Sequence, residues 1–320
     1  MHESLATAAL AVHLLLVNLA MSAPLLALGL EIRQSRTGDA VAGRLARRLV
    51  SAAQWSLLAA IGLGGILAFV VWREPSPSYF RAVEVFPRSR LWFGAGELLF
   101  YFVCLGAYGA LWERLRRHRW LHRLLAVAAV TNLWYHFPPL FTMLAQIASR
   151  PELQAAPLDR QAVYHLLTSG AVLSRVAHVW IASLAVGGLY LAYLAAAGDE
   201  SEMAPNAGSG EKQPGEPSGL APAHARLAIF GGRMALVATL AQLPVGLWVL
   251  LELPESARDA LFGGKLWLAS ALVLSLAAVI RLLHQLAAIA LGEVSRPWFS
   301  RAAISRVWLI PSHRRLSRHR

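Results

Sequence analysis

The chain has 320 residues, of which 57% are hydrophobic, and a formal net charge of +12. Long uncharged runs rich in Leu and Ala predict a polytopic helical membrane protein and exclude an ordinary soluble domain. Period-2 alternation is absent, which argues against a β-barrel. The basic residues lie in short segments between apolar runs, where they set membrane topology, so nucleic acid is not an expected partner.

An all-α bundle of about seven membrane-spanning helices of roughly 20 or more residues each fits the apolar runs. In chain order, we expect these helices near residues 5–31, 49–72, 90–112, 120–147, 162–197, 224–253 and 264–292. The segment 162–197 is longer than a bilayer requires. Its first turns are therefore expected to stand outside the membrane.

Loop charges predict the orientation of this bundle. The Arg-rich segments 32–48 and 113–123 and the tail after residue 293 are expected in the cytoplasm. The connections 73–89, 148–161 and 254–263 are near charge balance and are expected outside. The N-terminus is then outside and the C-terminus inside, in a multi-pass protein of a bacterial cytoplasmic (inner) membrane.

Composition also divides the chain along its length. Residues 1–197 form a predicted five-helix bundle and residues 223–297 a two-helix C-terminal part. Between them, residues 198–222 are polar, acidic and rich in Pro, Gly and Ser, which predicts a disordered cytoplasmic linker. Residues 298–320 predict a basic amphipathic tail on the inner membrane surface.

Two of the apolar runs carry side chains that are costly to bury in a membrane. His13 lies roughly 12 Å into the first run, and it can ligate a metal or bond a neighbouring carbonyl. Glu97 lies in the third run between glycines and aromatic residues. Glu97 can be interpreted as an iron ligand, as part of a proton relay, or as an acid near the outer interface.

The fourth and fifth runs carry two further histidines. His136 precedes Pro138 and Pro139, which bend a helix and open its hydrogen-bond ladder. His178 follows Arg175 by three residues on a face that is otherwise small. At helical spacing that face comprises Ala171, Ser174, Arg175, His178, Ala182, Ala185 and Gly188.

Such a face suits a flat cofactor, with His178 as an iron ligand and Arg175 as the partner of a haem propionate. A helix–helix seam, where small residues also gather, is the alternative interpretation. His13, His136 and His178 are expected at similar depth below the outer surface. The single Cys104 excludes a cysteine-based metal cluster, and no CxxCH motif is present, so any haem is held non-covalently.

The remaining polar residues of the apolar runs have weaker interpretations. Arg233 must snorkel or pair, and Met234 is either an axial thioether or a core filler. His165 serves a second haem or the outer surface, the latter being favoured. The other histidines are expected to be solvated or interfacial: His118, His122, His224, His284, His313 and His319.

Over about residues 1–197, the order of these features resembles subunit I of the cytochrome bd quinol oxidases. The likeness is carried by the early His13, by Glu97 before a Phe-rich run, and by Arg175 three residues before His178. Trp120, Asn132 and Trp134 in the fourth run add to it. The resemblance implies that His178 is an axial ligand of a low-spin haem b, that His13 and Glu97 line a high-spin haem region, and that Arg175 serves a propionate.

The chain also departs from that family. A second carboxylate about two turns after the first is missing, the connection between the last two helices is short, and the chain has fewer helices. His136 matches no ligand of the family. The resemblance therefore implies a shortened, divergent bd-like haem scaffold, and the departures put oxygen reduction and the usual quinol site in doubt.

The leading hypothesis is a membrane electron-transfer subunit with two or three b-type haems, and with room for a further haem and a quinone. It would pass electrons between quinol and other membrane subunits of a respiratory complex, a subunit II-like protein or cytochrome c. The alternatives are a terminal quinol:oxygen oxidase, a transporter whose path is lined by Glu97, Arg175 and Arg233, and a haem-free membrane anchor. Whether the chain is an enzyme, a quinol-linked oxidoreductase, stays open.

Overall fold

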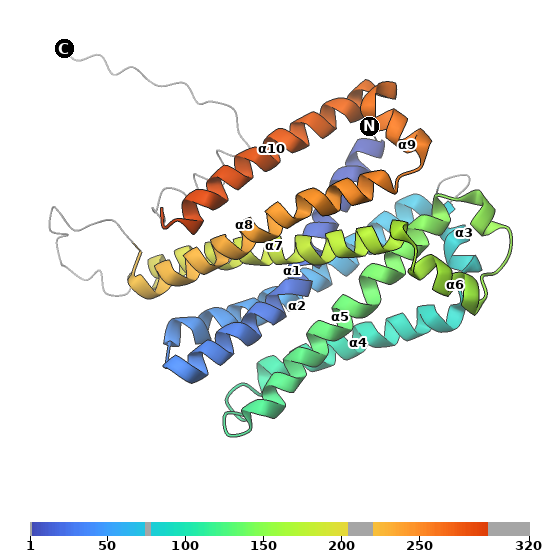
Figure 1. Cartoon of the computed structure of the whole chain (residues 1–320). Helices are drawn as coiled ribbons and strands as arrows, with labels where there is room; N and C mark the ends of the chain where they lie inside the picture. Colours follow the sequence, from blue (N-terminus) through green and yellow to red (C-terminus); the bar gives the residue numbers. More distant parts are fainter. Residues whose placement is uncertain (1, 74–77, 204–219, 294–320) are drawn as a thin grey trace, which may run out of the picture.

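The computed structural model describes residues 2–73, 78–203 and 220–293, and all regular elements in these ranges are helical (Figure 1). Seven of the described helices are long and apolar enough to cross a membrane. The expected fold class, an all-α bundle with about seven spanning helices, is confirmed to this extent. The orientation of the bundle in the membrane stays a prediction.

The helix boundaries follow the apolar runs with several short additions. The elements are α1 (His2–Thr37), α2 (Ala40–Trp72), α3 (Ser78–Val85), α4 (Arg88–Ala110), α5 (Arg119–Ala148), the 3₁₀ helix η1 (Pro151–Gln154), α6 (Arg160–Leu167), α7 (Gly170–Met203), α8 (Pro222–Leu251), α9 (Glu255–Asp259), the π-helical turn η2 (Ala260–Gly264) and α10 (Leu266–Ala290).

The predicted loop 32–48 is wrong, because most of it is helical. Arginine is a good helix former, and the arginines of this segment lie on the extended ends of α1 and α2. The chain reverses within Gly38, at φ 72°, and Asp39, which caps α2 by accepting a hydrogen bond from the Ala42 N–H at 3.1 Å. Burial alone would raise the pKa of Asp39, but this hydrogen bond and the Arg33 guanidinium at 2.9 Å lower it.

The predicted single helix 162–197 is divided into two. α6 ends at Leu167 and the spanning helix α7 begins at Gly170, with Ser169 accepting a hydrogen bond from the Val172 N–H at 3.4 Å through its side chain. α7 then continues to Met203, so the first residues of the predicted 198–222 linker are helical. The rest of that linker up to residue 219, and the predicted tail 298–320, lie outside the described residues.

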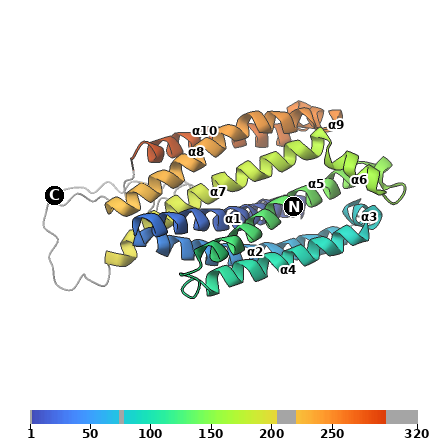
Figure 2. The ribbon, with the colours of Figure 1, turned by 60° about the horizontal axis from the view of Figure 1, so that its bottom comes forward.

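Figure 2 shows the long helices in succession from α10 through α8, α7 and α1 to α4. The closest approach is between α7 and α8, where a Cβ added to Gly188 would lie 2.7 Å from the Gly231 carbonyl oxygen. Such contacts let the two helix backbones touch. The seam interpretation is therefore correct for Gly188, at the far end of the small-residue face of α7.

The last spanning helix stands apart from the packed core. None of the most apolar window of α10 is buried, and Trp267 and Leu274 are 64% and 69% exposed. A spanning helix can leave such a surface open only against lipid or another membrane-embedded chain. Contact with the lipid bilayer is thus part of this architecture.

Candidate functional site

His178 lies on α7 with a buried ring nitrogen that has no partner. Its Nδ1 makes no hydrogen bond, and the same holds for the Ser174 hydroxyl one turn earlier on the same face. Buried polar atoms are nearly always paired, so an orphaned pair of groups calls for an explanation. A ligand between the helices is one explanation that the described side chains leave open.

His13 on α1 is held by the backbone of α2. Its Nδ1 lies 2.9 Å from the carbonyl oxygen of Ala60, which can only accept, so Nδ1 carries the proton. This contact leaves Nε2 with its lone pair. Metal-ligating histidines commonly donate one N–H to a carbonyl while the other nitrogen binds the metal. The arrangement therefore fits both interpretations of His13, a metal ligand and a side chain that bonds a neighbouring carbonyl.

Glu97 on α4 faces two side chains of α5. Asn132 donates a hydrogen bond to its carboxylate, and His136 Nε2 lies 3.9 Å from the same oxygen. The side-chain oxygen of Asn132 is buried without a partner. The structure thus places both Asn132 and His136 against the same carboxylate oxygen of Glu97, a grouping absent from the sequence analysis.

Two contacts show where the three histidines lie along the axis of the bundle, a position that we call their height. Gly187 packs against Ser22 of α1, and α1 and α7 run in the same direction (Figure 1). His178 and His13 each lie nine residues before these positions, so they share a height along parallel helices.

The second comparison joins α7 to the antiparallel α5. Trp180 Nε1 donates to the Trp134 carbonyl at 3.0 Å. His178 lies two residues before Trp180 and His136 two residues after Trp134, which again matches their heights. Since α1, α5 and α7 also pack against one another, the three imidazoles lie in one layer of the bundle. We call His13, His136 and His178 the histidine layer.

The histidine layer is not a single metal centre. The described part of the chain contains no group of three or more His, Cys, Asp or Glu side chains that could hold a metal ion. Each imidazole would instead serve a separate position, as an axial ligand does on a haem. The donor atoms of the layer are imidazole nitrogens, and Glu97 lies beside only one of them, at His136.

The other predicted site residues have separate surroundings. Arg175 donates from Nη1 to the Ala171 carbonyl of its own helix at 2.6 Å. Arg233 is exposed and donates to the Ala290 carbonyl of α10 at 3.0 Å. Met234 lies beside Gly188, which is ten residues, or about 15 Å, along α7 from His178. Arg233 and Met234 are therefore not brought to the histidine layer.

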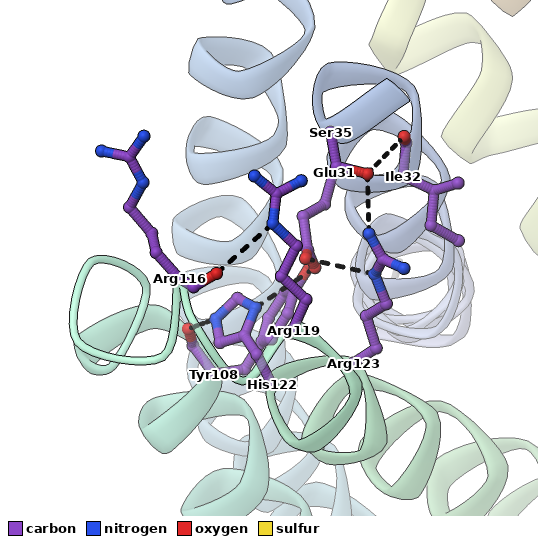
Figure 3. Close-up of polar contacts among 8 residues, drawn as sticks. All are labelled: Glu31, Ile32, Ser35, Tyr108, Arg116, Arg119, His122 and Arg123. Carbon is purple, nitrogen blue, oxygen red and sulfur yellow. Dashed lines mark hydrogen bonds and ion pairs between the residues drawn. The ribbon is translucent and has the colours of Figure 1, made fainter. Parts of the chain in front are cut away.

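A second polar group, missed by the sequence analysis, lies at the end of α1. Glu31 is 6% exposed and accepts from Tyr108 Oη at 2.9 Å and from Arg123 Nε at 3.4 Å, and its carboxylate lies 3.2 Å from His122 Nδ1. Figure 3 shows these side chains converging on Glu31 from α4 and α5. We call Glu31, Tyr108, His122 and Arg123 the Glu31 cluster.

The expectation that His122 and His224 are solvated is wrong, because each is 3% exposed. His122 is 3% exposed and its ring stacks on Tyr108, with centroids 4.3 Å apart. Its Nε2 lies 2.7 Å from the Tyr108 carbonyl oxygen and must therefore carry a proton. A sequence signal existed: Glu31 follows Ala27 by one helical turn, on the face of α1 that also holds Ala20 and Ala23, all buried.

A pocket of about 390 Å³ adjoins the Glu31 cluster. Glu31 and His122 form part of its wall, together with residues from the neighbouring ends of α1 and α2 and from the α4–α5 connection. The charges in this wall are mostly arginine: Arg47, Arg116 and Arg119. This arrangement can receive an anion.

No protein-family model matches this chain, and neither a curated protein nor a solved structure matches it.

Proposed function

We propose that this chain is a membrane-embedded electron-transfer subunit that holds b-type haem between α1, α5 and α7, within a bd-like respiratory complex. The observation that carries the proposal is the unpartnered Nδ1 of His178, buried in the same layer as His13 and His136. The resemblance of residues 1–197 to cytochrome bd subunit I supports the choice of cofactor. A bound b-type haem supplies one-electron chemistry.

The two histidines that we assign to iron differ in the surroundings of their ring nitrogens. His178 has a buried Nδ1 that no group of the described chain uses. His13 is oriented by the Ala60 carbonyl, which fixes its tautomer and leaves Nε2 as the donor atom. His136 is kept as a third candidate because it shares their height.

Arg175 is the proposed partner of a haem propionate. One of its N–H groups is engaged by the Ala171 carbonyl, and a guanidinium has five such donors. The others can form the charge-assisted bonds that carboxylates make with arginine, and the charge of Glu252 already acts on this guanidinium. Its place one turn before His178 puts this charge beside the proposed ligand.

Glu97 is assigned to proton exchange with a quinol. It is oriented by Asn132, and the imidazole of His136 lies 3.9 Å away, so a proton has a neighbouring base to move to. Quinol oxidation releases protons as well as electrons, and a carboxylate–imidazole pair can accept them. Other membrane subunits would cover α10, whose apolar surface the described chain leaves open.

The test is a reduced-minus-oxidised optical spectrum with a pyridine haemochrome assay on the full chain, purified in detergent after expression with haem supply. We expect b-type bands, with the low-spin band lost in His178→Ala. The matched control is His165→Ala, because His165 is exposed on α6 and its removal should leave the spectrum unchanged.

Two results would count against this assignment. A protein without haem would return the chain to the anchor or transporter hypotheses, and substrate flux that is lost in Glu97→Gln would then favour the transporter. A spectrum that is unchanged in His178→Ala but altered in His13→Ala or His136→Ala would move the ligand assignment to that helix.

A further inference from the structure

The pocket beside the Glu31 cluster lies where four spanning helices end. It is bordered by the last turns of α1, the first turns of α2 and α5, and the connection that follows α4. The ends of spanning helices lie at the depth of lipid headgroups. The pocket therefore lies at the depth of the membrane interface.

The acids of the pocket wall are already paired. Glu31 is engaged by the other members of its cluster, and Glu113 bonds Arg47 at 2.9 Å and faces Arg116 at 3.6 Å. Arg119 faces no acid within ion-pair distance and donates from Nε to the Arg116 carbonyl at 3.4 Å. The described wall thus has positive charge in excess.

The backbone adds to this preference for an anion. α5 begins at Arg119, and its N-cap, His118, makes no side-chain hydrogen bond to the first turn. The N–H groups at the start of a helix, and the positive end of its dipole, favour a negative group placed beside them. Figure 3 shows the guanidinium groups of Arg116 and Arg119 pointing the same way beside the cluster.

The side of α5 that faces away from the bundle is apolar. Trp120, Leu124 and Val127 are 70%, 52% and 41% exposed, and their spacing of four and three residues places them on one side of the helix. This stripe begins one residue after Arg119, about 80–140° around the helix from it. A ligand with an anionic head at the start of α5 and a hydrocarbon tail in the surrounding bilayer fits this position, whereas a free anion uses only the arginines.

We propose that this pocket binds the phosphate headgroup of an anionic phospholipid, whose acyl chains extend into the bilayer around α5. Arg116 and Arg119 contact the phosphate, and Arg47, 5.6 Å above the Trp112 ring, closes the far wall. The site needs neither haem nor the histidine layer. It anchors the α4–α5 connection to one leaflet.

The test titrates the full chain in detergent with phosphatidylglycerol and counts bound lipid by native mass spectrometry. Removing both arginines in R116Q/R119Q should weaken phosphatidylglycerol binding about thirtyfold, given the contribution of each basic side chain near a charged headgroup. Phosphatidylcholine serves as the neutral lipid and should bind weakly to all variants.

The matched control is R114Q/R117Q. It removes the same charge from the same connection, and these arginines are exposed like Arg116 and Arg119, but neither belongs to the pocket wall. The control should bind phosphatidylglycerol as the wild type does. Equal weakening in the two double variants would overturn the pocket in favour of diffuse surface attraction.

Two further arms separate the remaining outcomes. Inorganic phosphate should not displace the lipid, and full displacement would show a soluble-anion site instead. R116K/R119K keeps the charge but loses the guanidinium fork, so binding should fall between the wild type and R116Q/R119Q. Unchanged binding by this pair would overturn the proposed contacts even if the glutamine variant fails to fold.

Discussion

The Glu31 cluster and the histidine layer are both polar regions inside an apolar bundle, but their hydrogen-bonding differs. In the Glu31 cluster the carboxylate has three partners, and both nitrogens of His122 face oxygens. In the histidine layer and beside it, His178 Nδ1, Ser174 Oγ and Asn132 Oδ1 are buried without partners.

Paired and unpaired buried groups have different consequences for stability. A fully paired buried network fixes how helices pack and costs stability when one member is removed. Unpaired buried groups cost stability as they stand, and they persist where a ligand completes them. The Glu31 cluster therefore acts as a clamp between α1, α4 and α5, whereas the unpaired groups of the histidine layer are the basis of the binding region that we propose.

The largest expected effect is that of Glu31→Ala. It leaves Tyr108, His122 and Arg123 without their common acceptor, so we expect a loss of about 3–5 kcal/mol in unfolding free energy. Denaturant unfolding in detergent measures it. Glu113→Ala is the control, because this acid is 65% exposed and its ion pairs should contribute only about 0–1 kcal/mol. Similar losses in both variants would contradict the clamp.

For the histidine layer, we expect a substitution to raise the unfolding free energy. In haem-free protein, His178→Leu removes an unsatisfied buried nitrogen, so we expect a gain of about 1–3 kcal/mol in unfolding free energy. The same replacement at His122 should destabilise, since it leaves the Tyr108 carbonyl and Glu31 without this partner. A loss of stability in haem-free His178→Leu would show that the ring has a structural role.

A smaller effect is expected for Tyr108→Phe. The ring still fills its place against His122, and Glu31 loses only one of its three partners. We expect a cost of about 1 kcal/mol, the usual net value of one hydrogen bond. A cost near that of Glu31→Ala would mean that the hydroxyl, and not the carboxylate, organises the cluster.

The smallest expected effect is a pH dependence of stability that arises from Asp39 at the α1–α2 turn, outside both regions. Asp39 has a pKa below its ordinary value of 3.8, so it stabilises the folded chain at pH above that value, and this contribution is lost as pH falls through the folded-state pKa. Melting midpoints at decreasing pH should fall less steeply for Asp39→Asn than for the wild type. Parallel curves would show that the ionisation of Asp39 contributes nothing, because asparagine still caps the helix.

Periodicity and hydropathy determined the spanning helices from the sequence alone, because a helix in lipid needs a run of apolar residues of bilayer length. Their ends were less accurate. The tight turn at Gly38 and Asp39 was predicted only as the long loop 32–48, since arginine clusters signal topology as well as solvent exposure. The break between α6 and α7 lies at Ser169, whose side chain caps α7; serine is a common residue at helix starts, but the sequence analysis did not use this signal.

The cost of polar groups in a membrane also drew attention to His13, Glu97, His136 and His178 before any packing was known. Tertiary structure alone decided which partners they have. The sequence cannot tell that Glu97 meets Asn132 and His136, or that His122 is enclosed against Tyr108 and Glu31. Helical spacing determines which residues share a face, but only the packing of one helix on another determines what that face meets.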